Sequence, residues 1–379
     1  MVSAAAGAEV RAAGAEVREL AAELAALTTR PWTLMEVCGG QTHAIVRWGL
    51  DQLLPPALRL LHGPGCPVCV TAASTIDAAL ELARRPGVIL ASYGDMLRVP
   101  GSVPGDDLLG VRAAGGEVRL VTAPQQAITL ARAHPDRQVV FLAVGFETTA
   151  PATALLARQA RALDLDNLSL LVAHVRVPPA MEAILTSSDP LSAQGDRVQG
   201  FLAAGHVAAV MGTTELEALA DRQGVPVVVT GFEPADLLRG VLACVRRLEA
   251  GRPGLENAYK RVVRTHGNPA AQALLAEVFT VVDRPWRGLG LIPGGGLDLA
   301  PAFADLDARR RFGLPCPGTQ EPPGPCIAGR VLQGRATPEQ CPAFGRECTP
   351  EQPLGAPMVS SEGACAAWFR YRPAGVGGR

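Results

Sequence analysis

Short apolar runs alternate with longer amphipathic stretches between about residues 32 and 250. The apolar runs have the length of buried strands, and helical periodicity marks most of the stretches between them. The predicted strands cover 34–37, 58–61, 88–91, 118–121, 139–144, 168–173, 208–211 and 225–230. Strand–helix alternation is typical of parallel sheets with helices on their faces. The pattern therefore predicts an α/β fold.

A short internal repeat indicates two similar units. Val-Gly-Phe-Glu-Thr at 144–148 and Thr-Gly-Phe-Glu-Pro at 230–234 each follow a Val-rich run and open a helical stretch. Two α/β modules that share a cleft would explain this repeat, although four residues are weak support. Glycine and proline dominate from residue 284 onward, which predicts a loop-rich end of the chain. We expect an Ala-rich N-terminal extension over 1–30, similar parallel-sheet α/β domains over 31–130 and 131–250, and a C-terminal domain over 251–379.

Composition and charge narrow the class of protein. The 379 residues include 35 Lys and Arg against 36 Asp and Glu, a net charge of −1, with no basic block. This balance argues against a nucleic-acid partner and against an acidic membrane surface. No apolar run reaches the roughly 20 residues that span a bilayer, so membrane insertion is not expected. Charged residues interrupt the first thirty positions, unlike a signal peptide, so we expect a cytoplasmic protein with reduced cysteines.

Four cysteines lie in the loop-rich end of the chain, which contains no histidine. They are Cys326, Cys341, Cys348 and Cys365, spaced C-x14-C-x6-C-x16-C. This spacing is too open for a zinc ribbon and lacks the tight run of a bacterial ferredoxin. A four-thiolate site built on loops suits a [4Fe–4S] cluster or a structural zinc ion, and the spacing alone leaves both open. Burial as simple apolar residues is the remaining alternative.

Three further cysteines lie in turns that follow predicted strands. Cys38 precedes Gly39-Gly40 and a helical stretch, a position where the helix dipole stabilises a thiolate and lowers its pKa. Cys66 and Cys69 form a C-x-x-C pair that leads into the next helix, a motif of redox or metal chemistry. Both turns belong to the carboxyl edge of a parallel sheet, where α/β proteins place their chemistry.

Two polar residues are secondary candidates for the same site. His43 lies five residues after Cys38 and could orient its thiolate, and Asp95 follows a predicted strand and could line the cleft. The structural alternatives are a satisfied histidine and an Asp95–Arg98 pair that fixes a loop. Glu147 is better suited to capping a helix than to acid catalysis.

Five ordered motifs carry a resemblance to a known family. They are Met35-Glu-Val-Cys-Gly-Gly-Gln-Thr-His43, His62-Gly-Pro-Gly-Cys-Pro-Val-Cys69, Tyr93-Gly-Asp-Met-Leu-Arg-Val-Pro-Gly-Ser102, Gly145-Phe-Glu-Thr-Thr-Ala-Pro151 and Met358-Val-Ser-Ser-Glu-Gly-Ala-Cys-Ala-Ala367. From about residue 33 to 371 the chain resembles the hydrogenase maturation protein HypD family. The resemblance implies two α/β domains around a cleft and a C-terminal domain with a [4Fe–4S] cluster. It also implies a scaffold that assembles the Fe(CN)2CO group of [NiFe]-hydrogenases with a small HypC-type chaperone and a HypE-type cyanide donor.

The resemblance assigns roles to the cysteines. It implies that Cys38 holds the iron that carries CN and CO and that Cys66 and Cys69 are a redox-active pair. It implies that the four late cysteines bind the cluster, which favours iron over zinc. The chain departs from the family at Gln41, where histidine is usual, and at Ala328 and Pro357, where cysteine is usual.

These roles describe an assembly scaffold with redox activity rather than a turnover enzyme. Two other functions remain open. One is a thiol–disulfide oxidoreductase in which Cys66 and Cys69 act on disulfides and receive electrons from the cluster. The other is a protein whose late cysteines hold a purely structural zinc ion.

Overall fold

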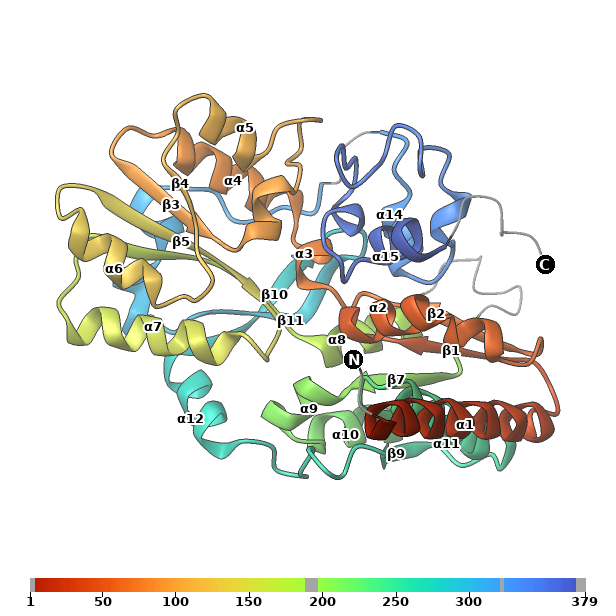
Figure 1. The fold of residues 1–379 in the computed structure, drawn as a ribbon. Coiled ribbons are helices and arrows are strands. Elements are labelled where there is room, and N and C mark those ends of the chain that lie inside the picture. The colour runs from red at the N-terminus through yellow and green to blue at the C-terminus, as the bar shows by residue number, and fades with distance from the viewer. Residues whose placement is uncertain (1–3, 188–196, 321–323, 373–379) are drawn as a thin grey trace.

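Two mostly parallel sheets and a loop-rich C-terminal region make up the fold (Figure 1). The computed structural model describes residues 4–187, 197–320 and 324–372. The five-stranded sheet has the order β2-β1-β7-β8-β9, and the six-stranded sheet has the order β10-β11-β6-β5-β3-β4. The α/β prediction with two parallel-sheet units is confirmed.

The strands of the five-stranded sheet are all parallel. They are β1 (Trp32–Glu36), β2 (Leu58–His62), β7 (Gly200–Ala204), β8 (Pro226–Thr230) and β9 (Gly254–Asn257). Alternate side chains face opposite layers. Leu34 and Leu202 pack toward α1 and α11, while Met35 and Phe201 pack toward α8, α9 and α10. Both faces are therefore buried, which explains why these strands appear as continuous apolar runs.

The six-stranded sheet contains four parallel strands and an antiparallel hairpin at one edge. Its strands are β3 (Val88–Ser92), β4 (Val118–Leu120), β5 (Gln138–Gly145), β6 (Leu168–Val175), β10 (Phe279–Trp286) and β11 (Gly290–Leu299). Leu90 and Val140 pack toward α4 and α5, and Ile89 and Phe141 pack toward α6, α7 and α12.

The helices cover both faces of the sheets, and short helices joined by loops make up the C-terminal region (Figure 1). The α-helices are α1 (Ala4–Leu27), α2 (Gly39–Trp48), α3 (Pro67–Val70), α4 (Ala73–Arg84), α5 (Leu108–Ala113), α6 (Gln126–Ala133), α7 (Ala150–Ala162), α8 (Val177–Thr186), α9 (Gly205–Met211), α10 (Thr214–Gln223), α11 (Pro234–Glu249), α12 (Pro269–Val278), α13 (Ala308–Phe312), α14 (Ala328–Leu332) and α15 (Ala364–Tyr371). The 3₁₀ helices are η1 (Leu50–Leu53), η2 (Gly94–Arg98), η4 (Pro301–Leu306), η5 (Pro338–Gln340) and η6 (Ala356–Met358).

The chain crosses between the two sheets more often than the expected boundaries suggest. The first two strands pair with β7, β8 and β9, whereas β3 to β6 form the other sheet. Each sheet thus draws strands from both sides of residue 130. The segment after residue 250 also completes both sheets, through β9 and through the hairpin of β10 and β11. Strand pairing depends on tertiary contacts that the local pattern does not contain.

The predicted strand at 208–211 is wrong. These residues form the second half of helix α9, which ends at Gly212 with a φ of 80°. The strand lies immediately before them, as β7. A short apolar run fits a buried helix as well as a buried strand, and here the run faces the core from a helix.

The Ala-rich extension is a docked helix. Along α1, Leu24 is fully buried against α11. Glu16 and Glu23 form ion pairs with Arg239 and Arg246 of α11. In Figure 1 the two helices lie side by side against the five-stranded sheet. Among the described residues, no helix combines the length and the apolarity that crossing a bilayer requires.

Candidate metal and redox site

Cys38 lies where the strand order of the five-stranded sheet reverses. The chain leaves β1 toward β2 on one side, whereas β7 leads to β8 on the other. Ligand sites of open α/β sheets lie at the carboxyl ends of the strands at such a point. Cys38 follows β1 as the N-cap residue of α2, and its side chain is only 2 % exposed.

Glycines let a second loop approach the Cys38 backbone closely. The N–H of Gly39 donates to the carbonyl oxygen of Gly65 at 2.7 Å, and the N–H of Gly63 donates to that of Glu36 at 2.8 Å. A Cβ atom at Gly65 would lie 2.1 Å from the Cys38 nitrogen. The turn that leads into the C-x-x-C pair is therefore packed directly on the Cys38 turn.

Replacing Gly65 by alanine should destabilise this junction strongly. The added methyl group meets backbone atoms of Cys38, which cannot move without displacing β1 or α2. We expect a loss of about 3 kcal/mol or more in the free energy of unfolding. Chemical denaturation measures this loss. Gly318→Ala is the matched control, because a Cβ atom there meets nothing within 4 Å. Equal stability of the two variants would contradict the close packing.

A buried carboxylate organises the Cys38 turn. Glu36 accepts hydrogen bonds from the N–H of Cys38 at 2.9 Å and from the hydroxyl of Thr42. Its other contact is with Nδ1 of His62 at 2.8 Å, at the end of β2. Glu36 is fully buried, so these partners replace its lost hydration. The network connects the ends of β1 and β2 to the first turn of α2.

His206 is the functional candidate that sequence reasoning missed. Its Nε2 lies 3.7 Å from the Sγ of Cys38, and its ring stacks on Phe232 with centroids 4.9 Å apart. It follows β7, the strand next to β1 at the reversal point. The sequence feature that could have identified His206 is the Gly205-His206 pair directly after an apolar run. The strand predicted at 208–211 was placed after this pair instead of before it, so His206 was not recognised as following a strand. Burial lowers the pKa of His206, which favours the neutral imidazole that can bind a metal.

The expected low pKa of Cys38 is wrong. Burial raises the pKa of this thiol, and the charges of Glu36 and Glu362 raise it further. Hydrogen bonds from the backbone N–H groups of Gln41 and Gly40 act in the opposite direction but do not prevail. Loss of hydration outweighs the helix terminus because the thiolate has almost no contact with water.

Cys66 and Cys69 form a disulfide, with their Cα atoms 5.2 Å apart. This differs from the expected reduced state of the cysteines. The bond spans α3, and the N–H of Cys69 donates to the Sγ of Cys66 at 3.2 Å. Both residues belong to the same buried cluster as Cys38. The structure therefore brings the three early cysteines together.

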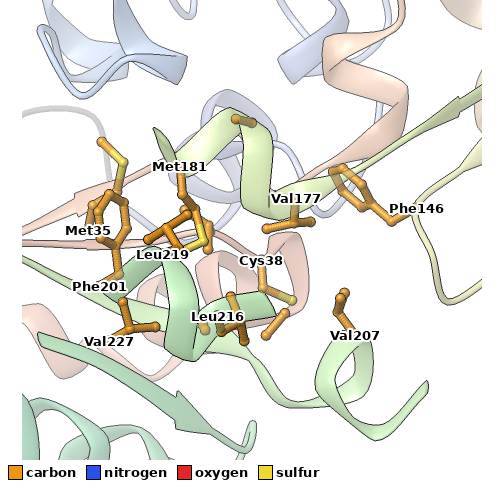
Figure 2. Packing of buried hydrophobic residues seen from close by; sticks show 14 of the residues in the cluster. Met35, Cys38, Phe146, Val177, Met181, Phe201, Val207, Leu216, Leu219 and Val227 are labelled. Atoms are coloured by element: carbon orange, nitrogen blue, oxygen red, sulfur yellow. The ribbon is translucent and has the colours of Figure 1, made fainter. Parts of the chain in front are cut away.

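The surroundings of Cys38 are largely apolar. Figure 2 shows its sulfur among Val177 of α8, Val207 of α9 and Leu216 of α10, with Phe146 at the end of β5 nearby. Side chains from helices and turns that follow strands of both sheets thus surround the site. A soft thiolate beside an imidazole in such surroundings suits a transition metal better than Mg²⁺ or Ca²⁺.

The four late cysteines line one small cavity in the C-terminal region. They are Cys326, Cys341, Cys348 and Cys365. The N–H of Leu354 donates to the Sγ of Cys348 at 3.4 Å, and Gly355 leaves no room for a Cβ beside the Sγ of Cys326. The fold therefore brings cysteines that are up to 39 residues apart in the sequence into one sulfur-lined cavity.

Burial and mutual repulsion raise the pKa values of three of these thiols. Burial raises the pKa of Cys365 well above its ordinary value, and the charges of the other three cysteines raise it further. Burial also raises the pKa of Cys326 and Cys348. Ala328 and Pro357, the two late positions at which the chain departs from the expected motifs, line the same cavity.

The secondary candidates have different surroundings. His43 contacts the carbonyl oxygen of Ser361 through Nδ1 at 2.9 Å and the hydroxyl of Tyr371 through Nε2 at 3.3 Å, so both ring nitrogens join α2 to the C-terminal region. Gln41 is buried and donates to the carbonyl oxygen of Ala203 at 3.3 Å. Asp95 lines a separate pocket at the end of β3. The other two cysteines are core (Cys244) and exposed (Cys316).

Glu147 caps a helix other than the one that follows it. Its Oε1 accepts the N–H of Val177, the first residue of α8, at 3.0 Å. Its Oε2 is buried and has no hydrogen-bond partner. Burial raises the pKa of Glu147 to about 7. The folded protein therefore prefers the protonated carboxyl.

This preference predicts a pH dependence of stability. The raised pKa makes a contribution to stability that is complete below the unfolded value of about 4.3 and is lost as the pH rises through 7. Glu147→Gln should remove this dependence. The free energy of unfolding of the variant, relative to that of the wild type, should therefore rise by roughly 2–3 kcal/mol from pH 5 to pH 8. Urea unfolding at the two pH values measures the gain. The exposed Glu217→Gln serves as control, and a parallel response of both variants would refute the assignment.

Comparison with known proteins identifies the family. The family model HypD, described as the Hydrogenase formation hypA family, matches residues 15–372. The hydrogenase maturation factor HypD of Azotobacter vinelandii is 48% identical over 344 residues, 90% of each chain. The factors of the same name from Rhodobacter capsulatus and Escherichia coli K12 are each 45% identical, over 92% of this chain and 91% of theirs. The chain therefore belongs to the HypD family of hydrogenase maturation factors.

Proposed function

We propose that this protein is the scaffold on which the Fe(CN)2CO group of a [NiFe]-hydrogenase is assembled. The observation that carries the proposal is the arrangement around Cys38, whose thiol lies beside His206 and in one cluster with the Cys66–Cys69 disulfide. In this function Cys38 holds the iron jointly with a thiolate of a small HypC-type chaperone. A HypE-type partner donates the cyanide groups.

Iron binding reverses the protonation of Cys38. A metal ion deprotonates a coordinating thiol outright, because its charge replaces the hydration that burial removed. The backbone N–H groups of Gly40 and Gln41 then stabilise the bound thiolate, and neutral His206 can act as a further ligand or hydrogen-bond partner. The raised pKa keeps the Cys38 thiol protonated until iron binds.

The Cys66–Cys69 pair supplies a reversible two-electron couple next to the iron. As a dithiol it releases two electrons and two protons and becomes the disulfide seen in the structure. These electrons serve the reductive release of cyanide or the formation of carbonyl. The shared cluster of Cys38, Cys66 and Cys69 supports this role.

The late cysteines are the proposed ligands of a [4Fe–4S] cluster. Four thiols share one cavity whose other lining residues are apolar, and four is the number of thiolates that such a cluster takes. A cubane takes one thiolate at each iron. When bound, the cluster supplies electrons one at a time.

Infrared spectroscopy tests the proposed function. The protein is purified anaerobically from cells that co-express the full maturation set, and the region of metal-bound cyanide and carbonyl stretches is recorded. We expect bands of both ligands. Absence of these bands, in a sample with bound partner and a brown cluster, would overturn the scaffold function.

A thiol–disulfide oxidoreductase is the second candidate. The Cys66–Cys69 disulfide favours it. Turnover of a generic disulfide substrate that persists in Cys38→Ala would support this function. Loss of turnover in that variant would instead tie the disulfide to the iron site.

A further inference from the structure

A crevice of about 690 Å³ opens at the carboxyl ends of β3 and β5. The strand order of the six-stranded sheet reverses here, because β3 leads to β4 on one side and β5 leads to β6 on the other. Open α/β sheets bind ligands at such a reversal. The corresponding point of the five-stranded sheet holds Cys38 and His206. The crevice is therefore a second place where this fold can take a ligand.

The turn between the two disulfide cysteines forms part of the wall of this crevice. Pro67 and Val68 line it and are half-buried. The cysteines on either side of them are only 3 % and 0 % exposed. Thiol–disulfide exchange requires that an incoming thiolate reach one sulfur of the pair. The crevice brings a ligand as far as the turn that covers these sulfurs.

The wall carries negative charge. Asp95 of η2 and Glu362 of the C-terminal region both line the crevice. Most of the other polar lining residues carry neutral hydroxyl groups, among them Tyr93, Thr148 and Thr149. No Lys, Arg or His is among the described lining residues. The charged side chains that line the crevice are therefore both acidic, which favours cations over anions there.

We propose that this crevice is the entrance through which a thiol reductant reaches the Cys66–Cys69 disulfide, and that it selects reductants with positive charge beside the thiol. The proposal rests on the redox role of the disulfide in the proposed function. The reductant is a free small thiol, because the crevice has the volume of a small-molecule site.

The exchange proceeds in two balanced steps. A thiolate of the reductant attacks one sulfur of the pair, so that a mixed disulfide forms and the other cysteine leaves as a thiolate. A second reductant thiolate then attacks the mixed disulfide. The products are the oxidised reductant and the Cys66/Cys69 dithiol, which takes up two protons.

Reduction of the full-length oxidised protein by three small thiols tests the selectivity. Free cysteines are first blocked with one alkylating reagent. Cysteamine, 2-mercaptoethanol and 2-mercaptoethanesulfonate then reduce the disulfide, a second reagent labels the released thiols, and mass spectrometry quantifies the peptide with Cys66 and Cys69. At equal thiolate concentration we expect cysteamine to react about tenfold faster than the sulfonate. The neutral thiol should fall between them.

Variants distinguish the crevice from a general charge effect. Asp95→Asn combined with Glu362→Gln should bring the rates of the cationic and anionic thiols within about twofold of each other. Asp136→Asn removes one exposed negative charge outside the crevice and should preserve the preference. A preference that survives the double variant would overturn the proposal, as would equal rates in the wild-type protein.

A steric variant tests the entrance independently of charge. Ala152 lines the crevice from the first turn of α7, so Ala152→Trp should slow all three thiols about tenfold or more. Circular dichroism checks the fold, and unchanged rates in a folded variant would overturn the proposal. The assay needs no iron and no partner. If the protein prefers cationic thiols but shows no infrared bands of bound cyanide and carbonyl, the entrance is supported and the scaffold function is refuted. If the bands are present but cationic thiols are not preferred, only the entrance is refuted.

Discussion

Replacing Cys38 by alanine is expected to abolish the infrared bands of iron-bound cyanide and carbonyl. The variant loses the one thiolate that this chain contributes to the iron in the proposed function, and His206 alone is a weaker ligand for a soft, low-spin iron. Loss of an outer contact to a metal ligand already costs 10–100-fold in affinity, so loss of the ligand should lower the band intensity by more than about tenfold. Infrared spectra of the co-expressed proteins measure it.

The Cys38 variant needs a control for the loss of a buried thiol. Cys244 is also fully buried, but it packs in the core between α11 and the five-stranded sheet. Cys244→Ala should keep the bands at a cost of about 1 kcal/mol in stability. The absorbance of the proposed iron–sulfur cluster should be the same in both variants. Bands that persist in Cys38→Ala would remove this residue from the iron site.

Replacing Cys341 by alanine should remove most of the iron–sulfur absorbance. The four thiols of the cavity equal the number of ligands that a [4Fe–4S] cluster takes, so each is needed. We expect a loss of more than about tenfold in cluster occupancy after anaerobic purification. Visible absorbance and iron and sulfide content measure it.

Cys316 provides the matched control for the cluster. It lies ten residues before Cys326 but is exposed and outside the cavity. Cys316→Ala should therefore retain the full absorbance. Equal loss in both variants would indicate an unspecific effect on the C-terminal region. An unchanged spectrum of Cys341→Ala would show that Cys341 is not a ligand.

Local patterns were sufficient for most of the fold class. Seven of the predicted apolar runs contain or overlap strands of the structure, because strands that are buried on both faces consist of consecutive apolar residues. The repeated Gly-Phe-Glu turns do follow β5 and β8, one in each sheet. The exception at 208–211 shows the limit, since a run of four apolar residues does not distinguish a strand from a buried helix.

The candidate site was recoverable in part. Cys38 and the C-x-x-C pair were recognisable because glycine-rich turns and a separation of three residues are local features. His206 was not, since it reaches Cys38 only through the pairing of β1 with β7, more than 160 positions apart. The pKa of Cys38 was also mistaken, because a helix terminus is visible in sequence and the burial that outweighs it is not.

The sequence by itself determined the α/β class, the family and which cysteines are candidates for the site. All three can be recognised from short local motifs. Only the tertiary structure decided which strands share a sheet, that His206 faces Cys38, and that the turn of the disulfide lines an acidic crevice. The physical reason is that strand pairing and burial are set by contacts between distant segments. Charge and hydration at a site follow from that packing, and no local pattern contains it.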